Sequence, residues 1–106
     1  MSDIDKAREA LTSRILEGNG QALPSERRAA FDNNGHAGPL GTLVDKVAMH
    51  ACRVSDEDIA AARAAGLSED QVFEIVVCAA IGQATRQYDT ALAALYAATA
   101  VATGKE

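Results

Sequence analysis

Two cysteines and two histidines are the side chains of this chain best suited to nucleophilic or acid–base chemistry. His50 and Cys52 are close neighbours in the sequence, whereas His36 and Cys78 lie in other segments. A thiol becomes a nucleophile when its pKa is lowered, and a nearby histidine can act as its base. His50 and Cys52 are therefore the candidate catalytic residues. Cys78 is expected to be structural, because its apolar surroundings would raise the pKa of the thiol.

The pairing of His50 with Cys52 depends on the backbone that carries them. The apolar spacing described below places both in one helix, in which each residue turns the chain by about 100°. Residues two positions apart then lie about 160° from each other, so His50 cannot be the base for Cys52 within that helix. Only a second helix or a second subunit could supply the base. The alternative is that Cys52 is a small hydrophobic residue, buried or half-buried.

Gln83 and Arg86 are the candidate ligand-binding residues of the longest predicted helix. At helical spacing they share a line with four apolar residues, namely Val72, Ile75, Val76 and Ala79. Polar groups on a buried line must be hydrogen-bonded to offset the loss of water. One interpretation is a network at a subunit interface, with Asp89 or an acid of the preceding capped turn as partner. The other is a polar lining for a pocket between helices.

His36 is a further candidate ligand-binding residue. It lies in a glycine-rich loop, GHAGPLG at residues 35–41, which leads into a predicted helix. The exposed amides at a helix start can hold an anion, and a histidine beside them would help. A plain connecting loop is the alternative interpretation, because glycine and proline are common in such loops.

The composition limits the class of partner. The chain has 106 residues and a formal net charge of -5, and no basic patch is apparent. Nucleic acids and anionic membranes both require such a patch, so neither is an expected partner. No apolar run approaches the ~18 residues of a membrane span, and the first residues lack the features of a signal peptide, which makes the cytoplasm the default location. Two cysteines, expected to be reduced, make neither a disulfide framework nor a zinc site, so we predict no metal and no cofactor.

The elements that must position these residues are all predicted to be helices. Capping pairs begin three of them, Ser2 with Asp5, Ser55 with Asp58 and Ser68 with Gln71, while Pro24 suits the first turn of another. The apolar residues from Leu40 to Val54 follow helical spacing, which predicts one continuous helix over that range. We therefore expect a single all-α domain, residues 1–106, of about five helices, with a helix-turn-helix core centred on Gly66 and a long C-terminal helix.

The long C-terminal helix is expected to be the central element. Residues 72–81 are apolar on every face apart from Glu74, which is typical of a helix buried on all sides. The tail from Ala97 to Glu106 is rich in alanine and threonine and is expected to fray. A small alanine-rich domain buries little apolar area, so it tends to need a partner surface to complete its core. We therefore expect a homo-oligomer.

The segment from Val44 to Leu95 resembles the alkylhydroperoxidase D and carboxymuconolactone decarboxylase superfamily. The resemblance rests on a capped short helix that ends in AxAAGLS, followed by a helix that reads EDQVFEIVVCAAIGQATRQYDTAL. It implies an alkylhydroperoxidase D-like helical domain that assembles into a trimer or a hexamer.

The reactive positions of that superfamily are not matched. A gapless match through Gly66 places the CxxC pair and the histidine of the peroxidases on Ala51, Val54 and Asp58. The glutamate and histidine of the decarboxylases would fall on the last two of these. A slip of one residue would bring Cys52 onto the first thiol position and Ser55 onto the second, without a histidine.

Three functions follow from these observations. The first is an oligomeric helical protein that has lost the dithiol chemistry and serves as a binding or structural module. The second is a single-cysteine, peroxidase-like antioxidant enzyme that uses Cys52, whose sulfenic acid an external thiol would reduce. The third is a small lyase or isomerase, in which Arg86 binds the carboxylate of a small-molecule ligand and His50 or His36 moves the proton.

Overall fold

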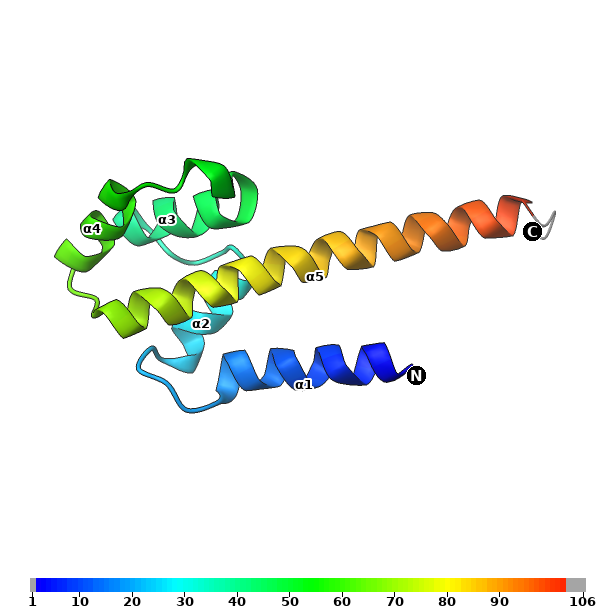
Figure 1. The fold of residues 1–106 in the computed structure, drawn as a ribbon, viewed down its shortest axis with the longest axis horizontal. Coiled ribbons are helices and arrows are strands. Elements are labelled where there is room, and N and C mark those ends of the chain that lie inside the picture. The colour runs from blue at the N-terminus through cyan, green and yellow to red at the C-terminus, as the bar shows by residue number, and fades with distance from the viewer. Residues whose placement is uncertain (1, 103–106) are drawn as a thin grey trace.

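The helices in the computed structural model begin and end close to the predicted positions. The structure describes residues 2–102, and within that range every regular element is helical (Figure 1). The helices are α1 (Asp3–Glu17), α2 (Pro24–Phe31), α3 (Gly38–Met49), α4 (Asp56–Ala64) and α5 (Glu69–Ala102), with a short 3-10 turn at Ala51–Arg53. The expected all-α fold with a long C-terminal helix is confirmed. The tail predicted to fray is helical from Ala97 to Ala102 in the structure, and its last four residues lie outside the described residues.

Side-chain caps fix the helix starts as the sequence predicts. The Ser2 hydroxyl accepts a hydrogen bond from the backbone N–H of Asp5 at 3.1 Å. At the start of α4, Ser55 and Asp58 satisfy each other's backbone N–H groups. Gly66, between α4 and α5, has a φ of 112°, a conformation that glycine adopts without strain. The helix-turn-helix unit is therefore built as expected.

The predicted continuous helix from Leu40 to Val54 is wrong at both ends. It begins at Gly38, because Pro39 is tolerated in a first helical turn. It ends at Met49, and His50 leaves the helical region with φ -147° and ψ 55°. The chain has to turn here so that α4 can pack back against α3, where Lys46 donates two 3.0 Å hydrogen bonds to the carboxylate of Asp58.

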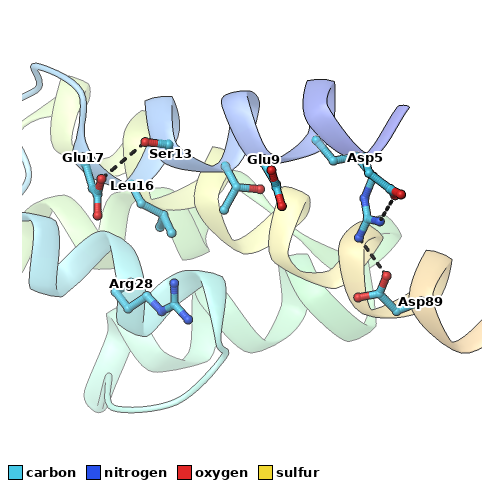
Figure 2. Close-up of a pocket in the computed structure, with 9 residues that line it drawn as sticks. Asp5, Glu9, Ser13, Leu16, Glu17, Arg28 and Asp89 are labelled. Atoms are coloured by element: carbon cyan, nitrogen blue, oxygen red, sulfur yellow. Dashed lines mark hydrogen bonds and ion pairs between the residues drawn. The ribbon is translucent and has the colours of Figure 1, made fainter. Parts of the chain in front are cut away.

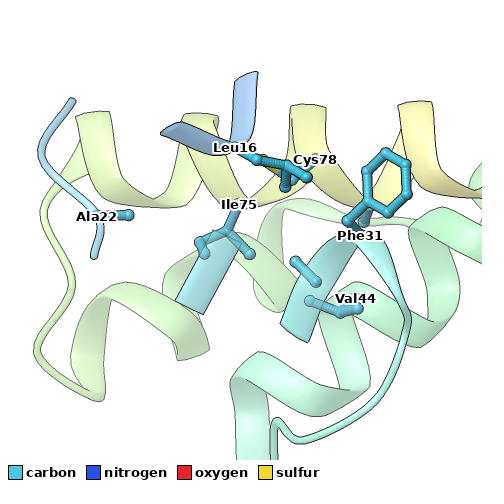
Figure 3. Packing of buried hydrophobic residues seen from close by; sticks show 8 residues of the cluster. Leu16, Ala22, Phe31, Val44, Ile75 and Cys78 are labelled. Carbon is cyan, nitrogen blue, oxygen red and sulfur yellow. The ribbon is translucent and has the colours of Figure 1, made fainter. Parts of the chain in front are cut away.

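Two clusters of apolar side chains form the core, and α5 contributes to both. The larger cluster joins α1, α2, α3 and α5 (Figure 3), and it contains Leu16, Ala22, Ala30, Phe31, Val44, Ile75, Cys78 and Ala79. The smaller one joins α3, α4 and α5 through Leu43, Ala62 and Val72. Because both clusters depend on its first half, α5 is the central element that the sequence predicts.

The end of α2 packs directly against the backbone of α5. A Cβ atom built on Gly82 would overlap the carbonyl oxygen of Phe31. One turn further along α5, Arg86 Nη1 donates a 2.6 Å hydrogen bond to that same oxygen. The last carbonyls of a helix have no partner within the helix, so this bond satisfies one of them. Glycine at position 82 thus permits an approach that no other residue allows.

The second half of α5 extends beyond the rest of the molecule. Figure 1 shows it continuing past the N-terminus of α1 and past α3, and the principal extents are 57 × 28 × 20 Å. The prediction that residues 72–81 are buried on all sides is wrong, because Phe73 is 68% exposed and Ala80 is also exposed. Four other helices of 8–15 residues cannot surround one of 34. Among the described residues, no helix has the length and apolarity that crossing a bilayer requires.

The contact at Gly82 makes a test of the fold. Alanine normally stabilises a helix interior by about 1 kcal/mol relative to glycine. Here we predict that Gly82→Ala lowers the free energy of unfolding by about 2 kcal/mol or more, because the added methyl group forces α2 away from α5. Urea denaturation measures the change. The exposed Ala84→Gly is the matched control and should lose only about 1 kcal/mol; a Gly82→Ala variant as stable as the original protein would contradict the contact.

Candidate functional site

His50 and Cys52 lie outside any regular α-helix. His50 is the residue after α3, Cys52 is in the 3-10 turn, and both are exposed. The expectation that Cys52 is buried or half-buried is wrong. It assumed a continuous helix from Leu40 to Val54, whereas α3 ends at Met49 and leaves Cys52 outside it. Ala51 is exposed as well, for the same reason. Among the described residues, neither the Cys52 thiol nor the His50 ring has a hydrogen bond to another side chain, and Cys52 is a free cysteine.

The other candidate residues occupy two separate open grooves. His36 and His50 both line a groove of about 560 Å³ along α3, together with Lys46 and Arg53 among others. Gln83 and Arg86 line a groove of about 540 Å³ on α5, with Met49 at its edge. Cys52 lines neither of them. Within one chain the structure therefore does not bring the candidate residues together in a single cavity.

Arg86 is held by hydrogen bonds to its own chain. Its Nε and Nη2 donate to Gln83 Oε1 at 3.3 and 2.9 Å, and its Nη1 donates to the Phe31 carbonyl. Arg86 is thus hydrogen-bonded, as a polar group on a buried line must be, but its partners join α5 to the end of α2 within one chain and include no acid. Asp89, proposed as its partner, instead accepts a 2.8 Å hydrogen bond from Arg8 of α1. These contacts explain Gln83 and Arg86 as residues that position helices.

His36 likewise holds two elements together. Its Nε2 lies 2.9 Å from the backbone carbonyl of Glu26 in α2. A carbonyl oxygen can only accept, so this nitrogen carries the proton and donates it. The bond ties the loop before α3 to α2, which supports the connector interpretation of the loop.

Cys78 is the structural cysteine that the sequence predicts. Its side chain is packed in the larger core cluster (Figure 3), and its Sγ donates a 3.5 Å hydrogen bond to the carbonyl of Ile15. Burial raises the pKa of the thiol and outweighs the opposing charge of Arg27. At neutral pH the group is a thiol rather than a reactive thiolate.

Glu74 has a role that the sequence interpretation missed. Its carboxylate accepts hydrogen bonds of 2.8–2.9 Å from the backbone N–H groups of Gln21 and Ala22, in the loop between α1 and α2. Burial acts to raise its pKa, but those two donors and the charge of Arg27 outweigh it and lower the pKa overall. The signal in the sequence is that Glu74 is the one charge in an otherwise uncharged run from Gln71 to Thr85.

A polar pocket between α1, α2 and α5 is lined by several charged side chains, including Arg8 and Asp89 (Figure 2). Arg8 bridges α1 to α5: its guanidinium lies 4.5 Å from the ring centroid of Tyr88 and donates to Asp89 at 2.8 Å. Asp5 and Glu9 line the same side. The salt bridges of Arg8 are partly exposed, so each adds little to the stability of the fold. Their main effect is to position α1 on α5.

Comparisons with protein families, with curated proteins and with solved structures find no match for this chain. Within the described residues, no three His, Cys, Asp or Glu side chains are grouped so that they could hold a metal ion. Any functional assignment therefore depends on the geometry of the chain itself.

The two cysteines should differ sharply in reactivity. We predict that dithiobis(nitrobenzoate) titrates one thiol rapidly in the native protein and a second only in denaturant, because Cys52 is exposed and Cys78 is buried. In the Cys52→Ser variant the rapid reaction should vanish, and the thiol that reacts only in denaturant should remain. Two fast thiols, or none, would contradict the placement of these residues.

The carboxylate of Glu74 should make stability depend on pH. Its pKa is lower in the folded chain than the ordinary value of 4.5, so its contribution is present above that pH and is lost as pH falls through the folded-state pKa. We predict that Glu74→Gln is less stable than the original protein at pH 7, and that the two converge below about pH 4.5. Thermal unfolding between pH 3 and 7 measures this.

Glu69→Gln serves as the control for Glu74→Gln. It makes the same substitution on the same helix, but Glu69 is exposed in the first turn of α5. Its effect should be small at every pH. A loss of stability in Glu74→Gln that persists unchanged to pH 3 would contradict the carboxylate's role.

Proposed function

We propose that this chain is a self-associating helical module, a divergent relative of the alkylhydroperoxidase D-like superfamily that does not use dithiol chemistry. The observation that carries the proposal is the end of α5 after Asp89, which extends from the body (Figure 1) and carries no charged residue. Leu95 is 57% exposed and Tyr96 is 66% exposed. From Thr90 to Ala102 the sequence has no charged residue at all.

The large apolar residues of the second half of α5 follow the spacing of a helix that packs against another helix. Tyr88, Leu92 and Leu95 are separated by four and then three positions. That alternation is the one found in coiled coils, in which such residues form the seam between helices. A lone exposed helix would gain nothing from it, so the pattern favours a packed partner.

Helix α1, which lies beside α5, also exposes large apolar side chains. It runs antiparallel beside α5 (Figure 1) and exposes Ile4 and Leu11, which are seven positions apart. We call Ile4, Leu11, Tyr88, Leu95 and Tyr96 the association face. All five side chains are 38–66% exposed, which is unusual for large apolar residues that have no partner.

A second copy of the chain is the partner that this face fits best. Because the end of α5 carries no charge, it offers nothing that would select a charged partner or reject an identical one. Small alanine side chains between the large residues allow close approach of two helices. The α1–α5 pairs of three copies packed around a common axis would form a helical bundle, which is compatible with the trimer or hexamer that the family resemblance implies.

The positions that would carry superfamily chemistry serve the structure instead. Asp58, at the position expected for the histidine, caps α4 and accepts from Lys46. The backbone N–H of Ser55 and then Lys46 lower its pKa, so it is a carboxylate at neutral pH. Arg86, the candidate carboxylate binder of the lyase alternative, is already bonded to Phe31 and Gln83. These contacts favour a binding or structural module over a peroxidase-like or lyase enzyme.

Charge placed on the association face should break the assembly. We predict that the original protein has a mass several times that of the 11.0 kDa chain, and that Leu95→Glu weakens association about tenfold or more, because a carboxylate would be buried at the seam. Sedimentation velocity or light scattering across micromolar concentrations measures both.

Ala97→Glu is the matched control for Leu95→Glu. It places the same charge on the same exposed turn but about 200° around the helix axis, away from the seam. It should assemble like the original protein. A monomeric original protein, or equal effects of the two variants, would overturn the proposal.

A further inference from the structure

Arg27 is a charged residue buried in the body of the protein. It is 5% exposed; its charge acts on the carboxylate of Glu74, but none of the salt bridges among the described residues involves Arg27. Its Nη1 donates to the carbonyls of Ile15 and Gly18 at 3.2 and 2.8 Å, which caps the end of α1. Its Nε has no hydrogen-bond partner among the described residues. Buried charges are normally paired, so this guanidinium retains capacity for an acceptor.

The residue lines a pocket of about 180 Å³ between α1, α2 and α5. Ile15, Phe73, Val77 and Cys78 supply a mostly apolar wall. A water molecule takes about 30 Å³ of the liquid, so the space suits a compact molecule rather than a single water or a large cofactor. The pocket is separate from the association face and from both grooves that hold the predicted site residues.

The charges around the pocket identify the class of ligand. Arg14, Arg27 and Glu74 line it, which is two positive groups and one negative group. The negative group is already committed, because Glu74 accepts from the backbone of Gln21 and Ala22. Arg14 is exposed to water, so Arg27 is the buried positive group of the pocket. A guanidinium binds a carboxylate with good geometry.

We propose that this pocket binds a small monocarboxylate with a short apolar or aromatic tail. Arg27 binds the carboxylate, and the tail packs against Ile15, Val77 and Cys78. This site is independent of self-association, since none of its residues belongs to the association face. It also differs from the Arg86 site considered from the sequence, whose guanidinium is bonded to its own chain.

Benzoate, benzamide and acetate are the probes that test the site. We expect benzoate to give saturable chemical-shift changes at the amides of Ile15, Val77 and Cys78. Benzamide, which has the tail without the charge, should bind about tenfold or more weakly, because it loses the charge-assisted bond. Acetate, which lacks the tail, should be similarly weak. Equal binding of benzoate and benzamide, shifts centred elsewhere, or no saturation would each overturn the proposal.

Three variants complete the experiment. Val77→Phe fills the pocket while keeping Arg27, and it should abolish benzoate binding without unfolding the chain. Arg27→Met should remove the preference for benzoate over benzamide. The adjacent Arg28→Met is the matched control, because Arg28 is exposed and lies outside this pocket, and it should bind as the original protein does. If Arg27→Met fails to fold, Val77→Phe still decides, and unchanged benzoate binding in it would refute the site.

Discussion

The arrangement of this protein depends on the carbonyl group of Phe31, where α2 meets α5. That oxygen lies over Gly82, where a side chain would overlap it, and it accepts a hydrogen bond from Arg86. The close approach lets the short α2 bury Ala30 and Phe31 against α5, while its Arg27 caps the end of α1. One backbone contact thus sets the position of two helices on the central one.

The same contact divides α5 into two halves with different surroundings. Before Gly82 the helix carries Ile75, Cys78 and Ala79 into the core, where shorter helices cover one side of it. After Arg86 nothing in the described chain covers it except α1, which reaches Tyr88 and Asp89 through Arg8. From Thr90 onward, an uncharged helix rich in alanine, with Leu92, Leu95 and Tyr96, is then left in water. Burial against a second copy is the simplest way to remove that surface from solvent.

Features set by neighbouring residues could be predicted from the sequence, and features set by distant contacts could not. The cap formed by Ser55 with Asp58 depends on local spacing, and it is present as expected. The end of α3 depends on where α4 packs, so the apolar spacing through Val54 misled the prediction. The partner of Arg86 is 55 residues away, and the loop that Glu74 holds is more than 50 residues away. No periodicity reports such distances. The one available signal, the lone charge of Glu74 in an uncharged run, was not used in the prediction.

Amide hydrogen exchange tests most directly whether the second half of α5 is an interface. In an isolated chain the amides from Thr90 to Ala102 would belong to a protruding helix, whose hydrogen bonds open easily. Exchange of this segment should be measured at low and high micromolar protein concentration, with the core amides of Ile75 and Cys78 as the reference. We predict that protection of the segment rises with concentration while the core is unchanged. Rapid exchange of the segment at every concentration would contradict the interface.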